Sequence, residues 1–204
     1  MPPLTPDETR NPWTVTSREV RYENPWLRLV HHEVLNPAGR PGIYGVVSFR
    51  NLAVGVIPVD AEGCTWLVGQ YRFPLDRYSW EIPEGGAPVG TDPADTARRE
   101  LIEETGLRAR NLKEFLRLDL SNSTTDETAF CYLAWDLERG ESEPEETEQL
   151  KVRRVRLREA LDLVLDGTIT DSISVAGLLR LKVMADDGAL PPGLADAVAR
   201  GLAR

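Results

Sequence analysis

The chain has 204 residues, of which 41% are hydrophobic, and a formal net charge of −9 at pH 7. This length suits one domain with an extension, and the hydrophobic content is enough for a sizeable core. No apolar run approaches the roughly 18 residues of a membrane span, and the acidic charge argues against general nucleic-acid binding, which needs a basic surface. We therefore expect a globular protein with neither a membrane nor a nucleic-acid partner.

The start of the chain and its two cysteines indicate where the protein works. Residues 1–15 form a polar, proline-rich stretch without the charged start and apolar run of a signal peptide. Cys64 and Cys131 have no CxxC motif or histidine partner nearby, as is typical of reduced, mostly buried thiols. The sequence therefore predicts a loose leader and a cytoplasmic location.

The first part of the chain is predicted to form a small antiparallel β extension. Residues 17–35 alternate apolar and polar side chains around a break at Asn24-Pro25, as two short strands do. A turn follows, and residues 43–47 read as a third strand. Residues 1–50 would then be separate from the main domain.

Fuller apolar runs follow. Residues 52–59 and 65–73 have the composition of strands covered on both faces, and the polar residues 60–63 between them predict a hairpin. Residues 78–86 predict one strand that runs into a glycine loop. This region therefore predicts the centre of a sheet.

The remainder of the chain predicts further strands at residues 112–120, 128–136 and 150–157. Closing helices are predicted at residues 158–166, 171–185 and 190–204. Strands that lead, one helix that interrupts them and helices that finish the chain argue for an α/β fold, a helix–sheet–helix sandwich with a mixed sheet. The predicted domains are residues 1–50, 51–188 and a C-terminal helical tail at 189–204.

Residues 85–107 contain the interrupting helix. Asp92 can cap its N-terminus, Pro93 suits its first position, and Gly106 can end it in a left-handed conformation. These signals predict a helix between Asp92 and Gly106.

Three carboxylates would share one face of that helix. Glu100, Glu103 and Glu104 lie at i, i+3 and i+4, where they repel each other unless a cation lies among them. Carboxylate oxygens are hard ligands that suit Mg²⁺ or Mn²⁺. Arg99 precedes Glu103 by four residues and can hold its carboxylate in place. The alternative is a solvated acidic helix.

The same stretch resembles the Nudix box, a pattern of one glycine, an Arg-Glu pair, two adjacent glutamates and a final glycine. The residues in register are Gly85, Arg99, Glu100, Leu101, Glu103, Glu104, Gly106 and Leu107. Thr91 departs from the pattern, because the family has its first glutamate there. The resemblance implies a Nudix-type α/β/α sandwich that hydrolyses a pyrophosphate with two or three Mg²⁺ or Mn²⁺ ions.

The resemblance also implies residue roles. The implied metal ligands are Glu100, Glu103, Glu104 and the backbone carbonyl of Glu84, with Arg99 and Glu103 counted among the catalytic residues. In similar hydrolases the general base comes from a glutamate loop after the box, which places Glu146 as the base and Glu148 as a further metal ligand. The alternative is that the glutamates of this acidic segment are solvated.

Substrate-binding residues are expected in four places, three of them outside the loops of the main domain's sheet. Arg72, in a Gln-Tyr-Arg-Phe-Pro stretch that related pyrophosphatases share, can bind a phosphate with its guanidinium fork or pair with a carboxylate. Glu81 matches an acidic position near the metals or the substrate. Trp26 and Tyr44 can stack on a nucleobase or pack in a core.

A polar loop joins the strands predicted at residues 112–120 and 128–136. Its Asn122 and Asp126 can bind sugar hydroxyls or cap a turn. The loop lacks the proline of dedicated ADP-ribose hydrolases, so it is more similar to hydrolases that accept several nucleoside diphosphate sugars.

The leading hypothesis is a Mg²⁺-dependent pyrophosphatase that splits a nucleoside diphosphate sugar, such as ADP-ribose or GDP-mannose, into a nucleoside monophosphate and a sugar phosphate. In similar enzymes the N-terminal extension swaps across a homodimer. Two alternatives stay open: a house-cleaning hydrolase of nucleoside triphosphates or dinucleoside polyphosphates, and a non-catalytic nucleotide sensor. The presence of Glu100, Glu103 and Glu104 disfavours the sensor, because sensors tend to lose these glutamates.

Overall fold

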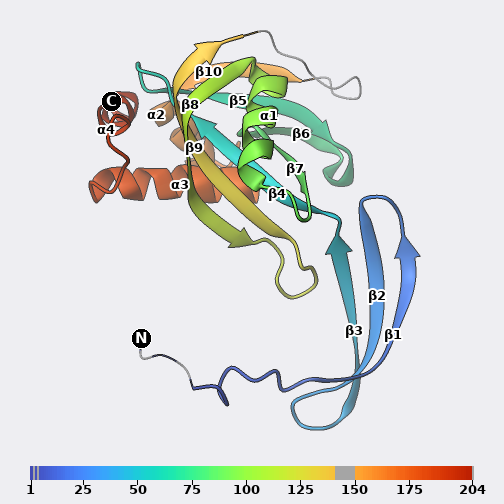
Figure 1. Ribbon diagram of the computed structural model, residues 1–204. Helices are drawn as coiled ribbons and strands as arrows, with labels where there is room; N and C mark the ends of the chain where they lie inside the picture. Colours follow the sequence, from blue (N-terminus) through green and yellow to red (C-terminus); the bar gives the residue numbers. More distant parts are fainter. Residues whose placement is uncertain (2, 4, 141–149, 204) are drawn as a thin grey trace. The chain divides into compact units, whose positions relative to one another are not determined.

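The computed structural model (Figure 1) describes the whole chain except residues 2, 4, 141–149 and 204. The chain divides into two compact units. The first contains residues 1–50 and 121–127, and the second contains residues 51–120 and 128–204.

The first unit is built on one three-stranded antiparallel sheet in the order β1-β2-β3. Its strands are β1 (Thr14–Glu23), β2 (Leu27–Leu35) and β3 (Pro41–Phe49). The predicted break between β1 and β2 is confirmed, because the Asn24 side chain accepts hydrogen bonds from the backbone N–H groups of Trp26 and Leu27 and turns the chain.

Residues 121–127 complete this unit although they lie far along the chain. The N–H of Val47 in β3 donates to the carbonyl of Thr124 at 2.9 Å, and Val47 forms a parallel bridge with Thr125. The polar loop at residues 121–127 is therefore hydrogen-bonded to the edge strand β3 of the three-stranded sheet.

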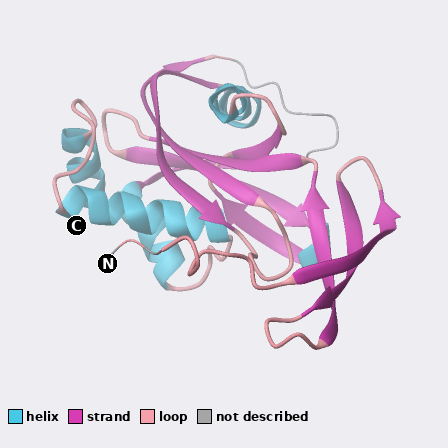
Figure 2. Cartoon of the chain, turned by 60° about the horizontal axis from the view of Figure 1, so that its bottom comes forward, coloured by secondary structure: helices cyan, strands magenta, loops and turns pink. Residues whose placement is uncertain are grey.

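The second unit has two sheets. One has the order β7-β4-β9-β8 and the other β10-β5-β6. The strands are β4 (Asn51–Pro58), β5 (Cys64–Arg72), β6 (Arg77–Glu81), β7 (Glu84–Pro88), β8 (Leu107–Asp119), β9 (Thr128–Arg139) and β10 (Lys151–Arg156). All strands of the chain are magenta in Figure 2, and those of the second unit are labelled β4 to β10 in Figure 1. Because β4 runs parallel to β9 but antiparallel to β7, the four-stranded sheet is mixed, as predicted.

The predicted hairpin between β4 and β5 is wrong. The turn exists, because the Asp60 carboxylate accepts hydrogen bonds from the N–H groups of Glu62 and Cys64. However, both edges of β4 are already occupied, by β7 and β9, so β5 pairs with β6 and β10 in the other sheet. Apolar composition identified the strands but carried no information about their neighbours.

The single strand predicted at residues 78–86 is also wrong. Pro83 has no N–H group to continue a ladder, and the chain passes there from β6 in one sheet to β7 in the other. Gly85 is consequently not in a loop but in β7, opposite Val54 of β4.

Helices cover both faces of the four-stranded sheet. The helical elements are η1 (Phe73–Leu75), α1 (Pro93–Thr105), α2 (Leu157–Leu165), α3 (Ser172–Asp186) and α4 (Ala195–Leu202). Side chains alternate between the two faces of a strand, so Val54 and Ile57, three residues apart in β4, lie on opposite faces. Val54 packs in a hydrophobic cluster with Leu101 of α1, and Ile57 packs in a second cluster with Leu178 of α3. The predicted helix–sheet–helix sandwich is therefore confirmed.

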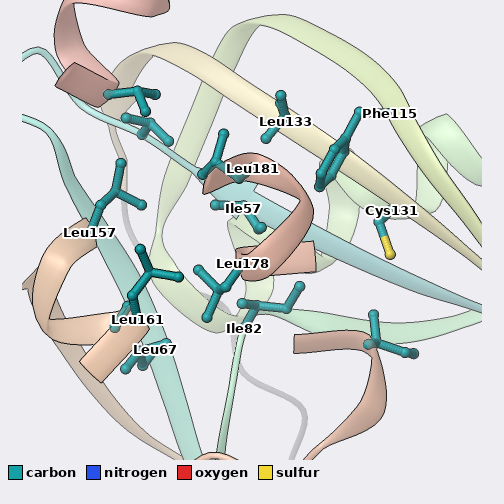
Figure 3. Packing of buried hydrophobic residues seen from close by; sticks show 14 of the residues in the cluster. Ile57, Leu67, Ile82, Phe115, Cys131, Leu133, Leu157, Leu161, Leu178 and Leu181 are labelled. Atoms are coloured by element: carbon teal, nitrogen blue, oxygen red, sulfur yellow. The ribbon is translucent and has the colours of Figure 1, made fainter. Parts of the chain in front are cut away.

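The larger core lies on the α3 side. Figure 3 shows Ile57, Leu67, Ile82, Leu133 and Leu178 packed together from both sheets and from α3. Helix α4 also contributes buried residues to this cluster, so residues 195–202 are part of the second unit. Among the described helices, none is both long and apolar enough to cross a membrane.

Candidate active site

Helix α1 forms as its sequence signals predict. The Asp92 carboxylate accepts a hydrogen bond from the N–H of Ala94 at 2.9 Å, and Pro93 occupies the first helical position. Gly106 ends the helix in the left-handed region with φ 69°, where its N–H donates to the carbonyl of Ile102. Both ends of the helix are therefore fixed by local contacts.

The predicted glutamate face lies beside the packing face of α1. Leu101 is buried in the smaller core cluster, and Glu100 and Glu104 are also buried, with exposed fractions of only 9% and 4%. Buried carboxylates are costly unless they are paired or hydrogen-bonded, so their contacts define what this face can do.

Arg99 is bonded to two of the three carboxylates. Its Nη1 donates to Glu103 Oε2 at 2.7 Å, which is the predicted contact, and its Nη2 donates to Glu100 Oε1 at 2.7 Å. The same Nη2 reaches the carbonyl of Gly86 at 3.3 Å. One guanidinium therefore orients both glutamates and links the helix to β7.

Glu100 and Glu104 both meet the backbone at the start of β7. Glu104 Oε2 accepts the N–H of Glu84 at 3.0 Å. A Cβ atom at residue 85 would lie 2.1 Å from Glu100 Oε1 and 2.2 Å from its carboxylate carbon, so only glycine leaves room for that carboxylate. The two glutamates therefore connect α1 to the Glu84–Gly85 peptide.

Thr91, which stands where the family pattern has its first glutamate, still closes a turn. Its hydroxyl donates to the carbonyl of Pro88 at 2.7 Å, and its backbone N–H donates to the same oxygen at 3.0 Å. The segment that leads from β7 into α1 is thus held by two hydrogen bonds without the glutamate of the pattern.

Arg72, at the end of β5, pairs with Glu81 of β6. Arg72 Nε lies 3.0 Å from both carboxylate oxygens, and Nη2 makes a further bond to Oε2. Burial is the largest single influence and raises the pKa of Glu81, but the hydrogen bonds and the positive charge of Arg72, with smaller contributions from Ser79 and Glu84, together leave this pKa below its ordinary value. Glu81 is therefore a charged partner that orients the arginine.

Comparison with known proteins identifies this arrangement. Residues 49–173 match the model of the NUDIX domain. The chain belongs to the Nudix family. Residues 13–47 also match the model of the nucleoside diphosphate sugar hydrolase N-terminal domain.

Relatives and a solved structure agree with this assignment. The chain is 38% identical over 169 residues to the ADP-ribose pyrophosphatase of Bacillus subtilis, covering 82% of this chain and 91% of that protein. It is 35% identical over 143 residues to the ADP-ribose pyrophosphatase of Mycobacterium tuberculosis, covering 68% of this chain and 69% of that protein. A crystal structure of an ADP compounds hydrolase shares the fold with a TM-score of 0.77 at 21% identity, covering 87% of this chain and 97% of that one.

The Nudix glutamates suit a hard divalent cation, which the family generally uses. Within the described part of the chain, no three His, Cys, Asp or Glu side chains are placed to hold a metal ion by themselves. Mg²⁺ is commonly held by one or two carboxylates together with water and substrate phosphates. The buried carboxylates of Glu100 and Glu104, directed at the same peptide of β7, fit that manner of binding.

The environment of the Glu84 side chain was not predicted from the sequence, because the family pattern involves only its carbonyl. Among the described residues, its Oε1 is buried without a hydrogen-bond partner and lies 3.9 Å from Arg72 Nη2. Burial, together with the charges of Asp171 and Glu81, raises the pKa of Glu84 well above its ordinary value. Nothing in the local sequence signalled this burial.

Because folding raises the pKa of Glu84, this group destabilises the folded state increasingly as the pH rises above the ordinary value of 4.5. We expect Glu84→Gln to raise the melting temperature at about pH 8 in buffer with a chelator, with the gain shrinking as the pH falls toward and below the ordinary value of 4.5, where both states hold the proton. Thermal unfolding of both proteins at several pH values between about 4.5 and 8 measures this difference in melting temperature. Glu138→Gln, at an exposed ion pair with Arg110, is the matched control. Parallel wild-type and Glu84→Gln profiles would contradict the assignment.

The predicted substrate residues of the first unit differ in their exposure. Trp26 is 68% exposed and so offers a free ring face. Tyr44 is partly exposed, but its hydroxyl donates to the carbonyl of Ser123 at 2.8 Å and its ring packs edge-on against Trp13. Tyr44 thus has structural contacts, whereas Trp26 has an accessible surface.

The two predicted loop residues also differ. Asp126 Oδ1 accepts the N–H of Phe49 at 3.0 Å, which joins the loop to the end of β3, while Asn122 is exposed. The predicted base Glu146 and ligand Glu148 lie outside the described residues.

Proposed function

We propose that this Nudix protein hydrolyses the pyrophosphate bond of nucleoside diphosphate sugars such as ADP-ribose or GDP-mannose. The observation that carries the proposal is the combination, in one chain, of the Nudix domain with an extension that matches the nucleoside diphosphate sugar hydrolase N-terminal domain. Water attacks one phosphorus, the bond from that phosphorus to the bridging oxygen breaks, and the other phosphate leaves. The products are a nucleoside monophosphate and a sugar phosphate.

Two or three Mg²⁺ or Mn²⁺ ions are the proposed cofactors. The side chains of Glu100, Glu103 and Glu104 and the carbonyl of Glu84 would hold them, with Glu148 as a further ligand. When bound, such ions neutralise phosphate charge and lower the pKa of a coordinated water. Arg99 supports this role because it fixes the carboxylates of Glu100 and Glu103.

The other proposed catalytic and binding groups act on the water and on the substrate. Glu146 would accept the proton of the attacking water. Arg72 would bind the diphosphate, since its Nη1 has no hydrogen bond among the described residues, while Glu81 keeps the guanidinium oriented. Trp26 and Tyr44 would contact the base, and Asn122 and Asp126 would bind sugar hydroxyls of the substrate.

We also propose a homodimer, with residues 1–50 as an extension that swaps between subunits, 51–188 as the hydrolase domain and 189–204 as a tail. Large apolar side chains of the three-stranded sheet are exposed, among them Val20, Tyr22 and Ile43 at 49%, 56% and 69%. Exposed apolar surface of this kind is typical of interaction sites.

A substrate panel tests the reaction. Purified protein with Mg²⁺ is incubated with ADP-ribose, GDP-mannose, UDP-glucose, ATP and a diadenosine polyphosphate, and the products are separated by ion-exchange chromatography. We expect a nucleoside monophosphate from at least one sugar nucleotide. Cleavage of ATP or the dinucleotide alone would replace the proposal by a house-cleaning activity. Calorimetric binding without any turnover would instead indicate a sensor.

A further inference from the structure

The second unit contains a cavity of about 340 Å³ beside the Arg72–Glu81 pair, with both apolar and polar residues in its lining. It lies between the β6 strand and the start of α3. The polar residues that line it include Arg72, Arg77, Ser79, Glu81, Thr170 and Asp171. Its size falls within the range of small-molecule sites.

Two of these residues have unused hydrogen-bonding capacity. Arg77 Nη2 donates to Thr170 Oγ1 at 3.0 Å, and among the described residues no carboxylate lies within ion-pair distance of Arg77. A guanidinium has five N–H donors, so most of them are available. Asp171 Oδ2 accepts the N–H of Ser174 at 2.7 Å as the cap of α3, and its Oδ1 has no hydrogen bond among the described residues.

This combination of donors and acceptors selects a class of ligand. A phosphate group can only accept hydrogen bonds, so it could use Arg77 but not Asp171 Oδ1, whose carboxylate charge repels it. A sugar hydroxyl both donates and accepts, so vicinal hydroxyls can use an arginine and a carboxylate together. No aromatic ring is among the described residues that line the cavity, so a nucleobase would find no stacking platform there. The cavity chemistry therefore favours a neutral polyol.

The cavity shares Arg72 with the proposed diphosphate site. Arg72 lines it and lies 3.9 Å from the carboxylate of Glu84, whose N–H is bonded to Glu104 of the Nudix box. Building on the proposed function, we propose that this cavity binds the terminal sugar of the nucleoside diphosphate sugar. Arg77 and Asp171 are then specificity-determining residues that contact its hydroxyls.

The test compares two substrates with the same diphosphate: ADP-ribose and the methyl ester of ADP, in which a methyl group replaces the terminal sugar. In Arg77→Gln, kcat/KM for ADP-ribose should fall at least about tenfold more than kcat/KM for the methyl ester, because only the former loses a hydroxyl contact. Asp171→Asn should show the same selective loss, since asparagine still caps α3. Arg110→Gln, which breaks an exposed ion pair with Glu138, is the matched control.

The outcomes separate this inference from the proposed function. A selective loss with ADP-ribose in either folded variant, each checked by its melting temperature, supports the sugar site. Equal losses with both substrates, or no loss in either variant, overturn it while leaving the hydrolase activity intact. A wild-type protein that releases a monophosphate from none of the sugar nucleotides in the panel overturns the proposed function and the sugar site together.

Discussion

Glu104→Gln should lower kcat by more than about a hundredfold, because the variant loses a negative charge that stabilises the transition state through the bound cation. Glu104 is only 4% exposed and accepts the N–H of Glu84 through Oε2. Glutamine has nearly the same shape, and its amide oxygen can still accept this hydrogen bond. The loss should therefore appear in turnover rather than in folding, and steady-state kinetics with ADP-ribose and Mg²⁺ measure it.

Glu138→Gln is the control for this variant. It changes a glutamate by the same chemistry, but at an exposed position on β9 that pairs with Arg110. Its kcat should equal that of the wild type. Unchanged turnover in a folded Glu104→Gln protein would mean that this face of α1 is not the metal site.

Gly85→Ala should lower kcat by about a hundredfold with a much smaller effect on stability. The new Cβ would lie 2.1 Å from Glu100 Oε1 and 2.7 Å from Oε2, so the carboxylate must leave its position against β7. A carboxylate is the mobile end of its side chain, and it can move without displacing the backbone. We expect the free energy of unfolding to fall by no more than about 1–3 kcal/mol, as measured by urea titration.

The matched control is Gly45→Ala in β3. A Cβ atom there meets nothing within 4 Å, so the substitution adds the same methyl group without a clash. This variant should keep wild-type kcat. If Gly85→Ala also keeps it, the position of the Glu100 carboxylate against β7 has no role in catalysis.

Local signals were enough to predict the helix that carries the glutamates. Asp92, Pro93 and Gly106 act within one turn of their own positions, so both the cap and the left-handed end follow from residue type. The contact from Arg99 to Glu103 was predictable for the same reason, because helical geometry fixes the spacing of four residues.

Sheet membership was not predictable from the same kind of signal. Residues 52–59 and 65–73 are apolar in similar ways, yet β4 and β5 belong to different sheets, and which edges are occupied depends on strands far along the chain. Pro83 was the one local sign of the crossing, since it cannot donate to a ladder, and the prediction of a single strand overlooked it.

The part of the site that the family pattern did not cover depended on three-dimensional packing. The burial of the Glu84 carboxylate near Asp171 follows from the placement of the start of α3 beside the connection between β6 and β7, which is fixed in part by a hydrogen bond from the N–H of Ile82 to the hydroxyl of Ser174. These residues are about ninety positions apart in sequence, and no periodic pattern joins them.

The central claim is that Glu100 and Glu104 bind divalent cations, and a Mn²⁺ titration tests it most directly. The electron paramagnetic resonance signal of free Mn²⁺ is followed as protein is added, for the wild type, for Glu100→Gln/Glu104→Gln and for Glu138→Gln. We predict saturable binding to the wild type and to Glu138→Gln, and at least about tenfold weaker binding to the double variant. Equal Mn²⁺ affinity in all three proteins would contradict the account.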